Sequence, residues 1–551
     1  MTELLTTIAL IFIVAGPFLL LANLFRLPTA PALIIAGLAV GPFIDPDLKL
    51  EIARLGIALL VFTFAIRIHT TDFKSVVGDA EVVGLGQISI LGVLGFVAGI
   101  LFGLPLDQAI FLGIAGAISS SIVGSTLFLP GDQDLIHDRL SESIHSIQDF
   151  VGLFILLIVS AGAYLLDPIA TQIGYGVMLL LVAIIINRYL FQLLSWLSGG
   201  GGETLFIGTI ALVLLFLGAA EFLGVSIVVG AFAAGVAVQY DPVEHESVIT
   251  GVDSMNEFFA AIFFITIGAL VTLPSTDVIL MTLTLIFLVT VIKPVLVIGL
   301  LIYKGYERRT ATLTGFNLDQ IGEFALIIAI EAVFLGLLLD SVFEAIILAA
   351  ALTLITSSFT RYYDEAIYHA LADRGFLGHY GKDVIRRSSI PDDLVDHVII
   401  IGYGHHGQHL VETCEAREQP YVVIESDPEL FDDVQANCEA YVFGDVIEPL
   451  AYDIAKLENA KLLISTADTW PVNDHVVSFS DRIDVIVRAQ TRENARTYLD
   501  RGALYATVSD LLAADRLEEY LTDLIDGKFD PTDLRKNPLH WREESVDEGA
   551  S

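Results

Sequence analysis

Residues 315–325 read Gly-Phe-Asn-Leu-Asp-Gln-Ile-Gly-Glu-Phe-Ala, in the middle of an otherwise apolar stretch that spans 311–335. A helix that crosses a bilayer needs roughly 20 apolar residues, and glycine, asparagine and aspartate are unfavourable inside it. A second apolar stretch, 107–129, is interrupted by Ala-Ile-Ser-Ser-Ser at 117–121 and by Gly124. Irregular backbone at membrane depth is tolerated only where it is buried in protein or lines a cavity. The sequence therefore predicts two broken membrane helices. The structural alternatives are serine back-bonding in the first and a small-residue packing site in the second.

Thirteen segments of the chain are apolar enough to be interpreted as membrane helices. They span approximately 4–24, 29–44, 52–68, 80–103, 107–129, 140–165, 172–196, 203–221, 223–239, 255–273, 277–303, 311–335 and 340–360. An odd number places the termini on opposite sides, and an excess of Lys and Arg marks the cytoplasmic loops. Loops on the side of the C-terminal part contain nine such residues: Arg26, Arg67, Lys74, Arg139, Arg188, Lys304, Arg308, Arg309 and Arg361. The other loops contain two, Lys49 and Arg54. We therefore expect a plasma-membrane protein with a cytoplasmic C-terminal part and an external N-terminus.

Composition supports two parts of different character. The 551 residues are 54% hydrophobic, with a mean hydropathy of +0.71, yet the formal net charge is −37. Such acidity resembles that of proteins from very salty habitats. A net charge of −37 also argues against a nucleic-acid partner, because the phosphates would be repelled. Two cysteines, Cys414 and Cys438, cannot build a disulfide framework. We expect a membrane domain at 1–365, a linker at 366–394, a soluble domain at 395–515 and an acidic tail at 516–551.

Few ionisable residues lie deep inside the predicted membrane helices. They are Asp149, Lys293 and Glu323. Each such residue costs about 2.5–3.5 kcal/mol on insertion scales and usually marks function. The alternative is that they pair with one another and hold the bundle together. Glu142, His145 and Asp149 follow the spacing i, i+3, i+7 and share one helix face, which predicts either an aqueous route for a cation or a polar packing seam.

The two breaks occupy corresponding positions in the chain. Helices four to six and eleven to thirteen each form a triplet with the break in the middle helix, and the triplets start on opposite sides of the membrane. Paired interruptions in inverted repeats are the best sequence indication of a transport site.

The first 365 residues resemble the monovalent cation:proton antiporter superfamily, in the branch of the Kef-type potassium efflux antiporters. The resemblance rests on Ser119-Ser120-Ser121, Gln148-Asp149-Phe150, Phe263-Phe264-Ile265-Thr266-Ile267-Gly268, Lys293 and Gln320-Ile321-Gly322-Glu323-Phe324-Ala325. It implies that Asp149 carries both the cation and the proton. The expected site comprises Asp149, Gln148, Ser119, Ser120, Ser121, Lys293, Gln320 and Glu323, in a homodimer.

A carboxylate between broken helices can bind a dehydrated cation or a proton, but not both at once. Competition at Asp149, combined with alternating access, makes exchange obligatory. Because Gln148 is neutral, one carboxylate exchanges one cation for one proton, unless Lys293 also releases a proton. Potassium is the expected cation and sodium the alternative. A potassium channel would need a carbonyl filter such as Thr-Val-Gly-Tyr-Gly, which the sequence does not contain.

A second motif lies in the acidic part. The apolar run 396–401 leads into Gly402-Tyr403-Gly404-His405-His406-Gly407, a G-x-G-x-x-G sequence followed by a helical stretch. The run 421–424 ends at Glu425, in the position of an acidic residue that binds ribose. Further expected strands are 440–443, before Gly444 and Asp445, then 461–466 and 484–489. Alternating strands and helices predict a doubly wound parallel sheet. The alternative for the glycines is a tight turn without a ligand.

Residues 394–515 resemble the nucleotide-binding domain that regulates potassium conductance, the RCK N-lobe or TrkA-N domain. The matching residues are Gly402, Gly404, Gly407, Glu425, Gly444 and Asp445. The resemblance implies gating by an adenine nucleotide or NAD(H), without chemistry, so we expect no enzyme. We expect His405, His406 and His409 to face solvent. A membrane-bound NAD-dependent oxidoreductase would need a substrate domain, and only about 35 residues follow residue 515.

Overall fold

Two compact units make up the computed structural model, Met1–His379 and Tyr380–Ser551. The residues described are 2–25, 29–67, 77–120, 135–160, 166–191, 202–238, 246–374, 384, 387–391, 393–508 and 522. The boundaries predicted at residues 365, 394 and 515 stay predictions.

The first unit is helical, as its apolar composition requires. Its helices are α1 (Thr2–Phe25), α2 (Thr29–Val40), α3 (Pro46–Arg67), α4 (Val77–Leu101), α5 (Leu106–Ala117), α7 (Ile136–Val159), α8 (Leu166–Ile185), α10 (Gly202–Leu223), α11 (Ile227–Val238), α12 (Glu246–Leu270), α13 (Thr276–Phe287), α14 (Lys293–Lys304), α15 (Arg308–Phe316), α16 (Glu323–Phe334), α17 (Asp340–Tyr362) and α18 (Asp364–Asp373). Among the described residues, five helical runs are long and apolar enough to cross a membrane by length and composition. The predicted number of thirteen stays a prediction.

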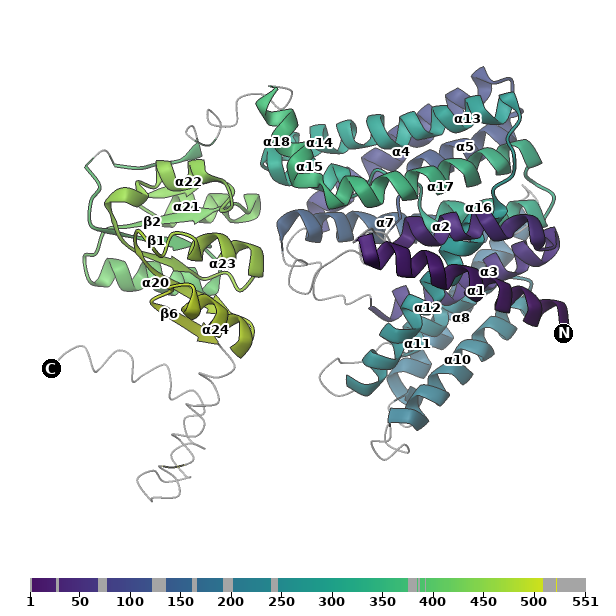
Figure 1. Ribbon diagram of the computed structural model, residues 1–551, viewed down its shortest axis with the longest axis horizontal. Coiled ribbons are helices and arrows are strands. Elements are labelled where there is room, and N and C mark those ends of the chain that lie inside the picture. Colours follow the sequence, from purple (N-terminus) through teal and green to yellow (C-terminus); the bar gives the residue numbers. More distant parts are fainter. Residues whose placement is uncertain are drawn as a thin grey trace. The chain divides into compact units, whose positions relative to one another are not determined.

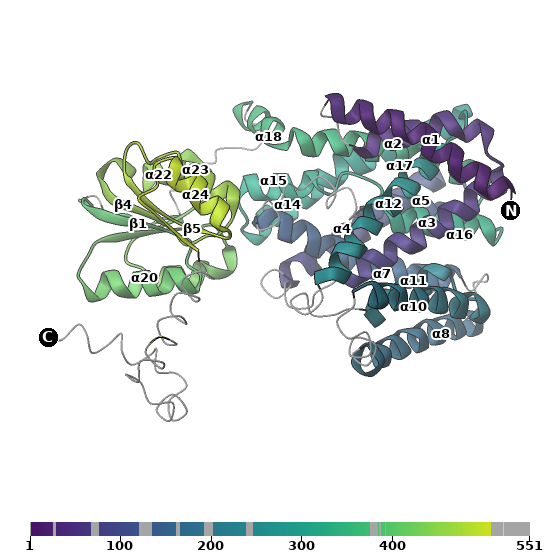
Figure 2. The same ribbon diagram turned by 60° about the horizontal axis from the view of Figure 1, so that its bottom comes forward.

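These helices pack in two groups. In one group α4 packs on α5, α7 and α14, while α16 packs on α7 and α17. In the other group α3 packs on α11 and α12, α2 packs on α1 and α12, and α8 and α10 pack on α11. Figures 1 and 2 both show α8, α10 and α11 together at one side of this unit. The predicted broken helices belong to the first group.

The helix predicted at 311–335 is divided, which confirms the second break. Its halves are α15 and α16, and residues 317–322 between them are not α-helical. At the first break, α5 ends at Ala117 and 118–120 continue without regular structure. The rest of that predicted helix, from Ser121 onward, lies outside the described residues.

A local widening interrupts the helical run from α13 to α14. The π-helical turn η4 (Leu288–Ile292) directly precedes Lys293 and Pro294. Proline has no backbone N–H and its ring crowds the preceding turn, so a π-bulge relieves the conflict. The bulge therefore sets the direction in which α14 presents Lys293.

The second unit is a doubly wound sheet, as predicted. Its strands are β1 (His397–Ile401), β2 (Tyr421–Glu425), β3 (Tyr441–Phe443), β4 (Ala460–Ser465), β5 (Asp484–Ala489) and β6 (Tyr505–Val508). They are parallel, in the order β3-β2-β1-β4-β5-β6. The predicted strands agree with β1 to β5, and β6 was not predicted. The order reverses between β1 and β4, which is where ligands bind in such sheets.

Helices cover both faces of this sheet and bury it. They are α20 (His405–Ala416), α21 (Phe431–Asn437), α22 (Pro449–Ile454), α23 (Trp470–Val477) and α24 (Arg492–Asp500). Figure 2 shows the sheet between α20 on one face and α23 and α24 on the other. Every residue of β1, β2 and β3 is buried. Apart from His397 at the start of β1 and Glu425 at the end of β2, these strands are apolar throughout and do not alternate with polar residues.

Candidate ion site and nucleotide site

The two breaks meet through their backbones. Gly322 N–H donates to Ile118 O at 2.9 Å. A β-carbon on Gly322 would lie 2.2 Å from Ser119 O, a distance that no side chain can occupy. Gln320 Nε2 donates to Ser120 O at 2.8 Å. Only glycine at position 322 therefore permits the two breaks to approach this closely.

Lys293 joins the two breaks from a third helix. Its Nζ donates to Ser119 Oγ at 3.2 Å and to Gln320 O at 3.1 Å, and the side chain is fully buried. Asp319, also buried, interacts with Lys293 electrostatically. A buried ammonium group needs such acceptors and a counter-charge. Lys293 thus holds one break against the other.

Gln148 and Asp149 are both buried in α7, with exposed fractions of 0% and 2%. Gln148 Oε1 accepts a hydrogen bond from Ser119 N at 2.6 Å. Gly152 lies about one turn beyond Asp149, on the same helix face, and a β-carbon there would lie 2.7 Å from Cβ of Phe324. The face of α7 that carries Asp149 therefore turns toward the start of α16, where the helix dipole favours a negative charge.

The structure links most of the predicted ion-site residues. Hydrogen bonds connect the set Ser119, Ser120, Gln148, Lys293 and Gln320. Glu323 is 3% exposed in the first turn of α16. Ser121 lies outside the described residues. Of the stripe on α7, His145 is buried and Glu142 is exposed. The roles assigned to these residues stay predictions.

Several polar residues that support the breaks were not predicted. Thr353 Oγ1 accepts a hydrogen bond from Ile321 N at 3.2 Å, and Ser357 Oγ donates to Gln320 Oε1 at 2.9 Å. Gln87 bonds to Gln148 across the first break. All three are neutral residues in apolar helices, so no charge in the sequence distinguishes them from ordinary packing residues.

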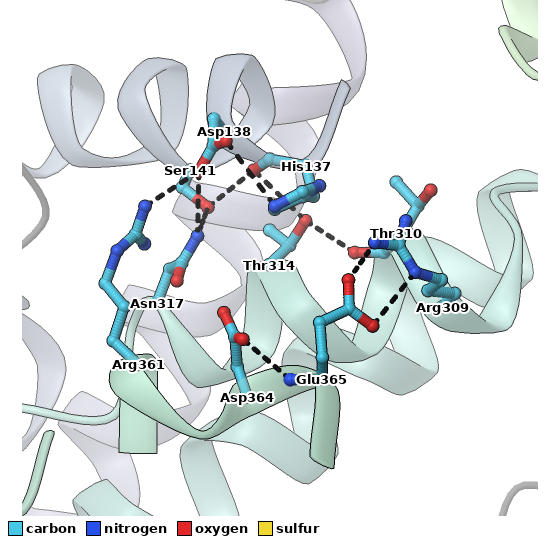
Figure 3. Close-up of polar contacts among 10 residues, drawn as sticks. All are labelled: His137, Asp138, Ser141, Arg309, Thr310, Thr314, Asn317, Arg361, Asp364 and Glu365. Atoms are coloured by element: carbon cyan, nitrogen blue, oxygen red, sulfur yellow. Dashed lines mark hydrogen bonds and ion pairs between the residues drawn. The ribbon is translucent and has the colours of Figure 1, made fainter. Parts of the chain in front are cut away.

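Figure 3 shows a polar cluster where α7, α15, α17 and α18 meet. Arg361 donates to Asp138 Oδ1 at 2.9 Å, and Asn317 Nδ2 donates to Ser141 Oγ at 3.0 Å. A further ion pair joins Arg309 in α15 to Glu365 in α18. Asn317 belongs to the second break, so this cluster ties the break to the ends of the surrounding helices.

The glycine-rich loop of the second unit is closed by contacts of its own backbone. Gly402 has φ +86°, a left-handed conformation that favours glycine. A β-carbon on Gly407 would lie 2.0 Å from Gly402 O. The start of α20 therefore packs directly on the end of β1, and a helix N-terminus favours the negative charge of a phosphate.

Glu425 holds this loop to the end of β2. Its carboxylate accepts hydrogen bonds from the backbone N–H of Tyr403 at 2.7 Å, Ser426 at 2.6 Å and Asp427 at 2.8 Å. Burial raises the pKa of Glu425. The carboxylate oxygens have further lone pairs, and the predicted ribose contact stays a prediction.

Other groups lie at the same end of the sheet. Gly444 N–H donates to Glu425 O at 2.8 Å, and Asp445 Oδ1 accepts from Ile447 N at 2.9 Å. The histidines of α20 are exposed, as predicted; they are His405, His406 and His409. Partial burial, together with the charge of Arg488, lowers the pKa of His406. The ends of β1, β2 and β3 thus present glycines and carboxylates together.

Two family models match the chain. The model described as "Sodium/hydrogen exchanger, transmembrane" matches residues 8–362, and the "TrkA-N domain" model matches residues 398–509. YbaL of Escherichia coli (strain K12), named for cation/proton antiport, is 25% identical over 94% of this chain and 97% of its own length. K(+) efflux antiporter 6 of Arabidopsis thaliana is 30% identical over 62% of this chain and 60% of its own.

A solved structure gives a likeness of fold. The sodium proton antiporter MjNhaP1 from Methanocaldococcus jannaschii covers 68% of this chain and 100% of its own, with 16% identity and a TM-score of 0.51. At this identity the likeness concerns the fold alone.

Proposed function

The chain belongs to the sodium/hydrogen exchanger family, and from this premise we propose that it exchanges K⁺ for protons at Asp149. It is a multi-pass cation/proton antiporter with a cytoplasmic TrkA-N domain. The observation that supports the proposal is the crossing of two broken helices, bonded through Gly322 and Ile118, beside the helix that buries Asp149. The relatives named for K⁺ efflux favour potassium.

Exchange follows from competition at one carboxylate. Asp149 binds either a dehydrated cation or a proton, because protonation removes the charge that holds the cation. Alternating access then exposes the occupied group to each side of the membrane in turn. The amide of Gln148 carries no charge, so one turnover exchanges one cation for one proton and is electroneutral.

Lys293 has a separate role in this proposal. Its ammonium group donates to Ser119 and Gln320, and Asp319 supplies a counter-charge. Through these bonds Lys293 holds the two breaks together, while Ser120 and Glu323 complete the polar surroundings of the exchanged ion. In this proposal the transported proton is carried by Asp149.

The experiment is proton flux in proteoliposomes driven by a K⁺ or a Na⁺ gradient. Asp149→Asn is expected to abolish exchange while the protein stays folded. Glu81→Gln provides the control, since it neutralises an exposed acid on α4, which lies off the α7 stripe that carries Asp149. Retained exchange in Asp149→Asn refutes the proposal.

Sodium is the second candidate cation, since the family model is named for sodium/hydrogen exchange. Flux driven by Na⁺ and not by K⁺ would establish it. Cation current without proton movement would instead mean a channel. A homodimer in the plasma membrane, with the N-terminus outside, completes this proposal.

Regulation is assigned to the TrkA-N domain. An adenine nucleotide or NAD(H) binds with its phosphates at the loop formed by Gly402, Gly404 and Gly407 and its ribose at Glu425, beside Gly444 and Asp445. Binding regulates transport only if it favours one transport state over another. Titration of AMP, ADP, ATP, NAD⁺ and NADH against thermal stability and exchange rate identifies the ligand. An unchanged exchange rate in saturating ligand refutes gating.

A further inference from the structure

Gln87 is a fully buried amide in the lipid-depth part of α4. Its Nε2 donates to Ala117 O, the last carbonyl of α5, at 2.6 Å. Its Oε1 accepts a hydrogen bond from Gln148 Nε2. Gln148 Oε1 in turn accepts from Ser119 N at 2.6 Å. Two side-chain amides therefore form a chain that spans the first break from its carbonyl to its N–H.

The orientation of both amides is fixed by the backbone at the two ends of this chain. The N–H of Ser119 can only donate, so the atom of Gln148 that faces it is Oε1. The carbonyl of Ala117 can only accept, so the atom of Gln87 that faces it is Nε2. Gln148 Nε2 and Gln87 Oε1 are then left to face each other as donor and acceptor, as the structure has them.

This arrangement does not accept a carboxylate at position 148. An ionised Glu there has no donor, so it would face the acceptor Oε1 of Gln87. Rotating the amide of Gln87 would supply a donor, but it would turn Oε1 toward Ala117 O. Either way a buried acceptor lacks a partner, and such a loss costs about 1–3 kcal/mol. Gln87 thus selects a neutral amide at position 148.

We propose that Gln87 is a positioning residue of the ion site. It acts through Gln148, and it fixes the first break and the turn of α7 that carries Asp149. It also keeps position 148 uncharged, so that the ion meets a single carboxylate at this point of α7. The inference rests on the proposed function in so far as it takes Asp149 as the carrier.

The main test compares Gln87→Met with Gln108→Met. Methionine keeps the size of glutamine and removes both hydrogen-bonding groups. Gln108 is the matched control: it is buried in α5, donates to Leu337 O at 2.9 Å and accepts from Leu339 N at 2.9 Å. It therefore loses similar bonds at the opposite end of α5 from the break.

Two readouts separate positioning from general stability. The first is the cation concentration for half-maximal exchange in proteoliposomes, with maximal rate measured separately. The second is the apparent dissociation constant from thermal stabilisation by KCl or NaCl in detergent. Gln87→Met is expected to raise both the cation concentration for half-maximal exchange and the apparent dissociation constant about tenfold. A tenfold change is equivalent to about 1.4 kcal/mol of binding free energy. Gln108→Met is expected to keep both within about twofold, at a lower unfolding temperature.

A double-variant cycle tests whether Gln87 acts through Gln148. Gln87→Met and Gln148→Met together are expected to raise the dissociation constant by less than the product of the single effects, as for residues in one network. A multiplicative result overturns the proposal. So does a normal dissociation constant in Gln87→Met, or an equal rise in Gln108→Met. If Gln87→Met does not fold, Gln87→Asn keeps an amide that is one methylene too short, and the same outcomes apply.

The binding readout keeps this inference distinct from the proposed function. Wild-type protein that binds a cation but does not exchange it refutes antiport at Asp149. The dissociation constants of the variants then still decide the role of Gln87.

Discussion

Replacement of Gly322 by alanine tests whether the two breaks must touch. The added β-carbon would lie 2.2 Å from Ser119 O and 2.5 Å from Ser119 C, whereas real β-carbons stay beyond 3.0 Å. Both neighbours are backbone atoms and cannot rotate away. The breaks must therefore separate by about 0.8 Å or more, and the 2.9 Å bond from Gly322 N to Ile118 O is lost.

The expected effect on transport is large compared with the effect on stability. Overpacking of this kind costs about 1–3 kcal/mol, which a large membrane bundle can survive. Misplacement of a functional site by about 1 Å lowers rates roughly 100-fold. We expect Gly322→Ala to insert and purify, and to exchange cations for protons about 100-fold more slowly in proteoliposomes with matched protein content.

Gly116→Ala is the control, because a β-carbon at Gly116 meets nothing within 4 Å. Alanine is favoured over glycine inside a helix by about 1 kcal/mol, so this variant should unfold at a higher temperature and transport normally. An exchange rate for Gly322→Ala within about threefold of wild type would refute the idea that contact between the breaks builds the site.

Three further predictions concern other parts of the chain. Gly407→Ala should abolish thermal stabilisation by nucleotide, because its β-carbon would lie 2.0 Å from a backbone oxygen, whereas Gly404→Ala should leave the ligand-free protein as stable as wild type because that position is open. Arg361→Met leaves the carboxylate of Asp138 buried without its 2.9 Å ion pair, and should destabilise the membrane unit by about 3–5 kcal/mol in chemical unfolding. Burial lowers the pKa of His397, whose Nδ1 has no hydrogen-bond partner among the described residues. The unfolded chain therefore binds more protons below about pH 6.5, so stability should fall with falling pH by up to about 1.4 kcal/mol per unit, and His397→Gln should remove that slope.

The sequence predicted the second break because Gly315, Asn317 and Asp319 are unfavourable inside an apolar helix. It could not predict that Gln320 bonds to Ser120, a residue 200 positions earlier. The acceptor in that contact is a backbone carbonyl. Every residue has one, so the sequence does not indicate which carbonyl will be used. The sequence indicates only that Gly322 is unfavourable in a helix. The structure requires glycine there because the backbone of a second chain segment, at Ser119, approaches too closely for a β-carbon.

Neutral polar residues account for most of what the sequence did not predict at the ion site. Lys293 and Asp149 were found because a charge is costly in lipid. Gln87 was not found, since one amide in an apolar helix is inexpensive and its partners are set by packing. In the second unit, β6 was missed because Tyr505–Val508 is four residues long and only its last residue is buried.

The spacing of the bonds around the first break has a consequence for biogenesis. At a synthesis rate of about 5–20 residues per second, the second break is translated about 10–40 s after the first, since their bonded residues are 200 apart. During that interval the nascent chain already contains both hydrogen-bond partners of the first break. Gln87 lies 30 residues before Ala117, and Gln148 lies 29 residues after Ser119. The two glutamines can thus satisfy backbone hydrogen-bonding groups of the first break until the second break is inserted and packs against it.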